Sequence, residues 1–206
     1  MKILKDGYYF IITPIFIIFI LFFVCDYNLF IFISSLCFII SLFFVYFFRD
    51  PRIKIISGHD LIVSPCNGTV IEISYTPTEK IIRVFLSIFD VHLQRSPVSG
   101  KIIKIDHKYG KFLNAMRKDA YIFNEQNIVI IEDSNCNKYI LKQIAGFFAR
   151  RCVLWVKKGD VLNSGDKIGM IKFGSQVDLY MPYNVDIKVK KGDKVIAGVT
   201  IFAILN

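Results

Sequence analysis

Histidine and tryptophan are scarce in this chain of 206 residues, which holds three histidines and one tryptophan. Neither an H-x-H pair nor an H-E-x-x-H motif occurs, and their absence excludes the zinc peptidases that these patterns mark. The G-x-S-x-G motif of serine hydrolases is also missing. No lysine lies between two methionines or between Asp and Ala, the two settings of the modified lysine in carrier domains. Three familiar functional classes are thereby removed.

Cysteine pairs are missing as well. The chain has five cysteines but no C-x-x-C motif, and Cys66, Cys136 and Cys152 are dispersed without a neighbouring histidine. This spacing favours reduced structural thiols over disulfides or a zinc site. We therefore expect a reducing compartment and no bound metal ion.

Charge is almost absent from the first 48 positions, which hold only Lys2, Lys5, Asp6 and Asp26 as charged residues. These four charges cancel, so the formal net charge of +9 lies entirely in residues 49–206. A basic part of this kind is attracted to anionic lipid headgroups or to nucleic acid. The apolar segments described next favour lipid, and no nucleic-acid partner is expected.

Two apolar runs, residues 8–24 and 29–48, would span roughly 25 and 30 Å as helices, which is enough for the hydrocarbon core of a bilayer. No small-residue cleavage site follows the first run, so we predict a membrane-anchoring helical hairpin over residues 1–48 rather than a signal peptide. Lysines and arginines flank both ends of this hairpin. The positive-inside rule then places the protein in the cell membrane, with residues 49–206 on the cytoplasmic side.

Short β-prone runs separated by Gly, Pro and Asp fill the chain from residue 61 onward. They are residues 68–75, 80–89, 100–106, 127–133, 138–146, 166–174 and 199–206. This spacing predicts a mainly β domain, a sandwich or a barrel, over residues 49–206. Residues 110–126 lack the pattern and predict a loop with at most one helical turn.

Two motifs recur within this part of the chain. SPCNGTVIEI (64–73) is echoed by SPVSGKIIKI (96–105), and VKKGD occurs at both 156–160 and 189–193. Gly-Asp after two lysines is typical of a turn. Repeats of this kind resemble the barrel-sandwich hybrid fold of biotinyl and lipoyl carrier domains. We therefore expect a barrel-sandwich-like domain, although a fold alone does not assign a function.

A Gly-Ser pair, Gly174-Ser175, separates two apolar, β-prone stretches near the C-terminal end. The common explanation of such a pair is a turn or a bulge. The alternative is self-cleavage, because a serine hydroxyl can attack the carbonyl carbon of the preceding peptide when a base removes its proton. The resulting ester can be split by β-elimination, and hydrolysis then leaves a pyruvoyl group at the new N-terminus. A pyruvoyl ketone can condense with a substrate amine and withdraw electrons from its α-carbon.

The stretch IKFGSQVDLYMP (171–182) closely resembles the maturation site of the phosphatidylserine decarboxylase proenzymes. FLSIFDVHLQRSPVSGKI (85–102), GKFLNA (110–115), NEQN (124–127) and QIAGFFARRCVLWVKKGD (143–160) follow the order of the same family. The resemblance covers nearly everything after about residue 60 and extends to the apolar N-terminus.

This resemblance implies a proenzyme that is cleaved between Gly174 and Ser175 into chains 1–174 and 175–206, which stay together as a heterodimer. A pyruvoyl group derived from Ser175 would form a Schiff base with phosphatidylserine in the bilayer and release CO2, leaving phosphatidylethanolamine. Neither pyridoxal phosphate nor a metal is expected.

His92 is the preferred general base and proton donor, because its ordinary pKa suits both tasks. A purely structural histidine at a strand end is the alternative. Asp90 lies two residues earlier and either orients the imidazole or caps a turn. Arg150 and Arg151 follow two phenylalanines, and either bind the anionic headgroup or belong to an ordinary alternating strand.

Two relay positions depart from the family pattern, and Gln126 stands where an Arg is expected. Asn67 occupies a position where other branches carry an Asp, and Arg95 aligns with the relay histidine of the longer bacterial enzymes, so that relay is not transferred to this chain. A non-enzymatic, membrane-anchored barrel-sandwich adaptor is the competing function, but it gives no reason for the context of Gly174-Ser175. A pyruvoyl decarboxylase of a soluble amino acid is disfavoured by the hairpin, since a soluble substrate needs no bilayer.

Overall fold

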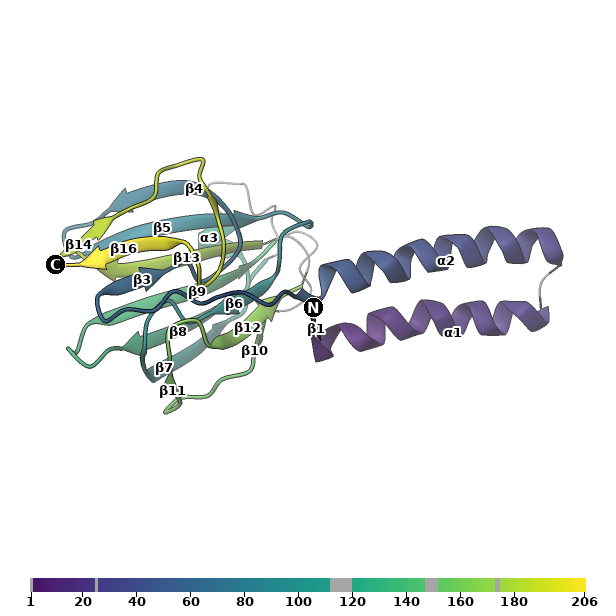
Figure 1. The fold of residues 1–206 in the computed structure, drawn as a ribbon, viewed down its shortest axis with the longest axis horizontal. Coiled ribbons are helices and arrows are strands. Elements are labelled where there is room, and N and C mark those ends of the chain that lie inside the picture. Colours follow the sequence, from purple (N-terminus) through teal and green to yellow (C-terminus); the bar gives the residue numbers. More distant parts are fainter. Residues whose placement is uncertain (1, 25, 112–119, 147–151, 173–174) are drawn as a thin grey trace. The chain divides into compact units, whose positions relative to one another are not determined.

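The computed structural model describes residues 2–24, 26–111, 120–146, 152–172 and 175–206. Contacts divide the chain into two compact units, residues 1–52 and 53–206, and each is described by itself. The first unit is helical and the second is mainly β (Figure 1). The predicted fold class, a mainly β domain preceded by an apolar helical hairpin, is confirmed.

The first unit consists of two antiparallel apolar helices. Its elements are β1 (Lys2–Ile3), the 3-10 helix η1 (Lys5–Gly7), α1 (Tyr8–Val24), α2 (Tyr27–Phe47) and β2 (Arg49–Asp50). Asp26 starts α2, because its side chain accepts a hydrogen bond from the Leu29 amide at 3.2 Å. The segments Lys5–Val24 and Tyr27–Phe47 are each long and apolar enough to cross a membrane.

The second unit contains one short helix and fourteen strands among its described residues. They are β3 (Leu61–Val63), β4 (Gly68–Tyr75), β5 (Glu79–Leu86), β6 (Leu93–Arg95), β7 (Gly100–Lys108), α3 (Ala120–Phe123), β8 (Gln126–Glu132), β9 (Lys138–Ala145), β10 (Cys152–Leu154), β11 (Val161–Leu162), β12 (Lys167–Ile171), β13 (Ser175–Pro182), β14 (Val185–Ile187), β15 (Lys194–Val195) and β16 (Ile201–Leu205). Each predicted run corresponds to one of these strands. The short α3 lies in the segment that was predicted to hold at most one helical turn.

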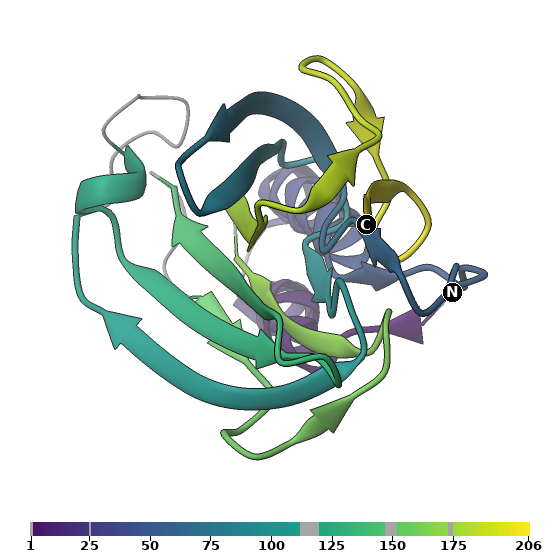
Figure 2. The same ribbon diagram turned by 90° about the vertical axis from the view of Figure 1, so that its left-hand side faces the viewer.

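Eight of these strands form one antiparallel sheet in the order β11-β7-β8-β9-β13-β5-β4-β15. This sheet is strongly curled, as Figure 2 shows. Its core consists mostly of Val, Ile and Leu side chains. Two three-stranded sheets, β10-β12-β6 and β14-β16-β3, complete the unit. Strand β13 lies between β9 and β5 near the middle of the large sheet, so a residue at its start has strand partners on both sides.

The sequence repeats fold as two equivalent halves. The amide of Gly159 donates to the Ile102 carbonyl, and that of Gly192 donates to the Val70 carbonyl, both at 2.8 Å. Ile102 and Val70 occupy the same position in the two SPxxG repeats. Both glycines have positive φ, +98° and +97°, so the two VKKGD turns share one conformation that favours glycine. The halves place β11 beside β7 and β15 beside β4.

Candidate active site

Ser175 is the first residue of β13 and is fully buried. It pairs with Leu86 at the end of β5 on one side and with Ala145 at the end of β9 on the other. Its side chain shares a face of the strand with Val177, a member of the core. Within the described part of the chain, Ser175 Oγ has no hydrogen-bond partner. An unsatisfied buried hydroxyl costs about 1–3 kcal/mol, and a functional role is one explanation of its presence.

His92 lies in the connection between β5 and β6, and its side chain is buried. Its Nδ1 is 2.9 Å from the backbone carbonyl oxygen of Asp90. Because a carbonyl can only accept, Nδ1 carries the proton, and the neutral imidazole has its lone pair on Nε2. The structure therefore fixes a tautomer in which Nε2 can act as the base.

Strand pairing brings His92 and Ser175 into one region. Leu86 is paired with Ser175, and the chain continues from Leu86 through a tight turn to His92. From the other direction, the amide of Ile171 at the end of β12 donates to the His92 carbonyl at 3.4 Å, four residues before Ser175. Two independent connections thus hold Ser175 and His92 at the same end of the sheet.

Asp90 uses its side chain to close the turn that leads to His92. Its Oδ2 accepts from the Ser87 amide at 2.8 Å, and its own amide donates to the Ser87 carbonyl at 2.9 Å. The backbone carbonyl of Asp90, not its carboxylate, receives the His92 Nδ1 proton. Of the two roles that the sequence left open for the Asp90 carboxylate, this geometry corresponds to the turn cap.

A chain of buried amides leads away from His92 across three strands. Gln94 Nε2 donates to the His92 carbonyl at 2.7 Å, and Gln143 Nε2 donates to Gln94 Oε1 at 2.8 Å. Asn127 Nδ2 donates to Gln143 Oε1 at 2.9 Å, and His107 Nδ1 donates to Asn127 Oδ1 at 2.7 Å. The connection to His92 is through its backbone carbonyl, so these amides hold the backbone from which the imidazole projects.

Asp178 lies three residues after Ser175 on β13 and is also fully buried. Burial raises the pKa of its carboxyl from 3.8 to about 6, although hydrogen bonding from Gln176 and the positive charge of Arg83 oppose this rise. Gln176 Nε2 donates to Asp178 Oδ1 at 2.6 Å, and Arg83 Nε is 3.3 Å from Asp178 Oδ2. Arg83 also contacts Glu72 at 2.6 Å and so bridges two carboxylates.

The two relay positions that depart from the family pattern have structural partners. Asn67 Oδ1 accepts from the Ala197 amide at 3.2 Å, and an Arg95 guanidinium nitrogen donates to the Gly165 carbonyl at 2.9 Å.

The thiol of Cys66, the residue before Asn67, is buried. Burial raises its pKa, and the negative charges of Asp90 and Asp178 raise it further. Cys66 is therefore a protonated thiol, which is a poor nucleophile.

Three of the predicted site residues, Gly174, Arg150 and Arg151, lie outside the described residues. Ser175, His92 and Asp90 are described, and the fold brings all three to the end of the large sheet where β13 begins.

Comparison with known proteins decides the family. The family model described as phosphatidylserine decarboxylase matches residues 40–203, which include every residue of this site. The chain belongs to the phosphatidylserine decarboxylase family. The resemblance noted from the sequence motifs is therefore confirmed, and an enzyme is favoured over an adaptor.

Several relatives of known name support this membership over most of their length. A phosphatidylserine decarboxylase proenzyme of Geotalea uraniireducens is 40% identical over 173 residues, covering 81% of each chain. One of Ehrlichia chaffeensis is 41% identical over 182 residues, covering 84% of this chain and 80% of the relative. A protein of Methanocaldococcus jannaschii, provisionally named an archaetidylserine decarboxylase proenzyme, is 40% identical over 187 residues, covering 79% of this chain and 90% of the relative.

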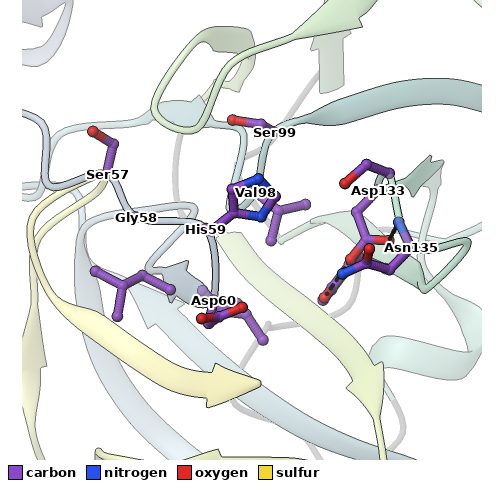
Figure 3. A pocket seen from close by; sticks show the side chains of 12 residues that line it. Ser57, Gly58, His59, Asp60, Val98, Ser99, Asp133 and Asn135 are labelled. Atoms are coloured by element: carbon purple, nitrogen blue, oxygen red, sulfur yellow. Dashed lines mark hydrogen bonds between the residues drawn. The ribbon is translucent and has the colours of Figure 1, made fainter. Parts of the chain in front are cut away.

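The β unit also contains a cavity of about 240 Å³, which lies away from Ser175 and His92 (Figure 3). It is lined by residues before and within β3 and by the β8–β9 turn, where the Asn135 amide donates to Asp133 Oδ1 at 2.8 Å. Strand β9 begins beside this turn and ends at Ala145, the partner of Ser175. The cavity is therefore at the opposite end of the sheet from the site.

Sequence reasoning missed the amide chain and the buried Asp178. The available signal was polar residues at inward or buried positions of otherwise apolar strands, namely Asn127 in NIVII, Gln143 in YILKQIA and Asp178 in QVDLYM. Such residues are buried only when they are hydrogen-bonded, so their presence in a strand indicates a buried polar network.

Proposed function

We propose that this protein is a self-processing, pyruvoyl-dependent enzyme that converts phosphatidylserine to phosphatidylethanolamine and CO2. The observation that carries the proposal is the buried Ser175 Oγ, which has no hydrogen-bond partner in the described part of the chain. Ser175 is the first residue of β13, at the end of the sheet from which β5 leads to His92. Family membership and the names of the relatives support the reaction and the lipid substrate.

Maturation begins with attack of Ser175 Oγ on the carbonyl carbon of Gly174. His92 Nε2 accepts the hydroxyl proton and returns it to the leaving nitrogen, so the peptide C–N bond breaks as the ester C–O bond forms. Removal of the Ser175 α-proton then expels the Gly174 carboxylate and leaves a dehydroalanine at residue 175. Tautomerisation and hydrolysis with one water release ammonia and leave the pyruvoyl group.

The two products, residues 1–174 and 175–206, are proposed to remain a heterodimer. Strand β13, which starts the small chain, is in register with eight residues of β5 and six of β9, all in the large chain. Its core side chains, among them Val177 and Leu179, are fully buried between these neighbours. Cutting one peptide bond at the end of the strand leaves both hydrogen-bonded ladders intact.

When the carboxylate leaves as CO2, the electrons of the broken C–C bond stay on the α-carbon of the substrate. In the mature enzyme, the pyruvoyl group would accept these electrons. The residues of the chain provide the rest. His92, oriented by the Asp90 carbonyl at 2.9 Å, is the proposed donor of the proton that replaces the carboxyl group. Burial around residue 175 excludes water from the reacting carbon. Arg150 and Arg151 are the proposed contacts of the anionic headgroup.

We propose further that the hairpin anchors the enzyme in the cell membrane with the β unit on the cytoplasmic side. The apolar segments Lys5–Val24 and Tyr27–Phe47 support membrane insertion. Lys2 and Lys5 before the hairpin and Arg49 and Arg52 after it support the cytoplasmic orientation of both ends.

The test is decarboxylation of phosphatidylserine by the full chain reconstituted into vesicles. We expect phosphatidylethanolamine from the wild type and none from Ser175→Ala. Ser164→Ala is the matched control, because Ser164 Oγ is likewise buried without a partner in the described residues but lies away from the β13 start. Product formation by Ser175→Ala would contradict the proposed function.

A further inference from the structure

We propose that the end of the large sheet that holds Ser175 carries an apolar rim which inserts into the headgroup region of an anionic bilayer. We define the rim as Ile88, Phe89, Tyr109, Ile122 and Phe123. All five are large and exposed, with Phe89 at 63%, Tyr109 at 85% and Phe123 at 50%. The inference rests on the proposed function, because the rim would bring a membrane-lipid substrate to the site at Ser175.

Strand register places the rim at the same end of the sheet as Ser175. Leu86 pairs with Ser175, so Ile88 and Phe89 follow directly beyond the strand end. On the other side of the sheet, β7 ends at Lys108 opposite Gln126, the first residue of β8, and Tyr109 comes next. Helix α3, which carries Ile122 and Phe123, belongs to the same β7–β8 connection.

The turn that displays Ile88 and Phe89 is rigid. The Asp90 carboxylate holds the Ser87 amide at 2.8 Å, and Ser87 Oγ accepts from the Phe89 amide at 3.1 Å. The same Asp90 orients His92 through its backbone carbonyl. One turn thus presents an exposed aromatic side chain on its outer side and the candidate base on its inner side, which links lipid contact to the position of the site.

The chemistry of this end fits a lipid surface. Aromatic and aliphatic side chains are usual at the depth of the headgroups, and contiguous exposed apolar side chains mark binding surfaces. Lys108 and Lys111 accompany them, and Lys111 Nζ lies 5.9 Å from the Phe123 ring centroid. Two acidic residues lie near these lysines in the described sequence: Asp106 pairs with Lys104 at 2.6 Å, and the Glu125 carboxylate lies 3.8 Å from His107 Nε2. The local charge therefore favours an anionic surface.

The opposite end of the sheet offers a matched comparison. Tyr75 and Tyr183 are exposed there at 62% and 53%, and Lys80 lies over both rings at 5.9 and 5.0 Å. These two positions have the same aromatic and cationic character as the rim, but β4 and β13 end beside them, far from Ser175.

Tryptophan fluorescence can locate the rim, because Trp155 is the only tryptophan in the chain. In a Ser175→Ala, Trp155→Phe background, Phe89→Trp and Tyr183→Trp each introduce one reporter. The full chain is reconstituted into phosphatidylcholine vesicles that contain phosphatidylserine, with bromine on the acyl chains of the phosphatidylcholine. We expect loss of most of the fluorescence at position 89 and little loss at position 183. Equal quenching, or stronger quenching at position 183, would overturn the proposal.

A functional measurement separates this proposal from the proposed function. Phe89→Ser with Phe123→Ser, in an otherwise native chain, should lower kcat/KM on vesicles about tenfold, while cleavage and activity on phosphatidylserine dispersed in detergent stay unchanged. Tyr75→Ser with Tyr183→Ser should change neither. If the wild type decarboxylates phosphatidylserine but the Phe89→Trp reporter is not quenched, the rim proposal is refuted and the proposed function stands. A quenched reporter in a chain that never decarboxylates lipid would leave the rim standing and refute the proposed function.

Discussion

Replacing Asp178 by Asn should make the protein more stable at neutral pH. Burial raises the pKa of this carboxyl from 3.8 to about 6, and a raised pKa in the folded state means that folding favours the protonated acid. Stability from this group is fully present below the unfolded pKa and is lost as pH rises through the folded value. The shift of about 2.2 (6 − 3.8) corresponds to about 3 kcal/mol in total.

The assay is thermal unfolding of the detergent-solubilised chain in a Ser175→Ala background, which keeps it uncut. Between pH 4 and 7.5 the difference between Asp178→Asn and its parent should move by about 2 kcal/mol in favour of the variant, or about 4–8 °C in Tm. The pKa of about 6 already includes the attraction of Arg83, so the expected change with pH takes the loss of that contact into account. Asp186→Asn is the control: this exposed carboxyl, whose pKa Lys188 lowers, should show no such trend.

A difference that stays constant with pH would refute this reasoning. So would a variant that becomes less stable than its parent as pH rises, because the attraction of Arg83 would then outweigh burial. In that case the carboxylate would be ionised throughout the range, and the strand after Ser175 would carry a permanent ion pair.

Three further predictions concern the site and its frame. His92→Gln keeps a polar side chain but loses the base, so cleavage should slow by about 10²-fold or more in a time course on denaturing gels. Gln143→Leu leaves the side-chain oxygen Oε1 of Gln94 without its hydrogen-bond donor. We expect the free energy of unfolding to fall by about 1–3 kcal/mol, which thermal unfolding would show as a lower Tm, together with slower cleavage. Gly159→Ala should cost about 1 kcal/mol in urea unfolding from its φ alone. Gly68→Ala should cost more, because its Cβ would lie 2.3 Å from a backbone oxygen of the adjacent strand.

The parts of the fold that depend on local pattern could be predicted from the sequence. The run 68–75 is strand β4 with the same bounds, and the apolar segments are the two helices. The paired SPxxG and VKKGD motifs indicated a repeated unit, and their glycines do adopt matching turns. In each case neighbouring residues carry the whole signal: apolar runs, alternation and turn-forming pairs.

Features that depend on strand register could not be predicted. Gln94, Asn127 and Gln143 lie on three different strands, and nothing local shows that they meet. The role of the Asp90 carboxylate stayed open for a related reason, because spacing alone does not distinguish a contact with His92 from one with the Ser87 amide. Long-range pairing decides where the three amides meet, and no local pattern in the sequence encodes it. The contact of the Asp90 carboxylate depends instead on the conformation of a single turn.

Intact mass spectrometry of the purified, denatured protein tests the central claim most directly. The account predicts two species, residues 1–174 and a small fragment of residues 175–206 whose N-terminus carries a keto group in place of the serine amine. Ser164→Ala should give the same two fragments, with the large one lighter by one oxygen atom, and Ser175→Ala should give one uncut chain. A wild type that remains a single chain, or a cut at any other bond, would contradict self-processing at Ser175.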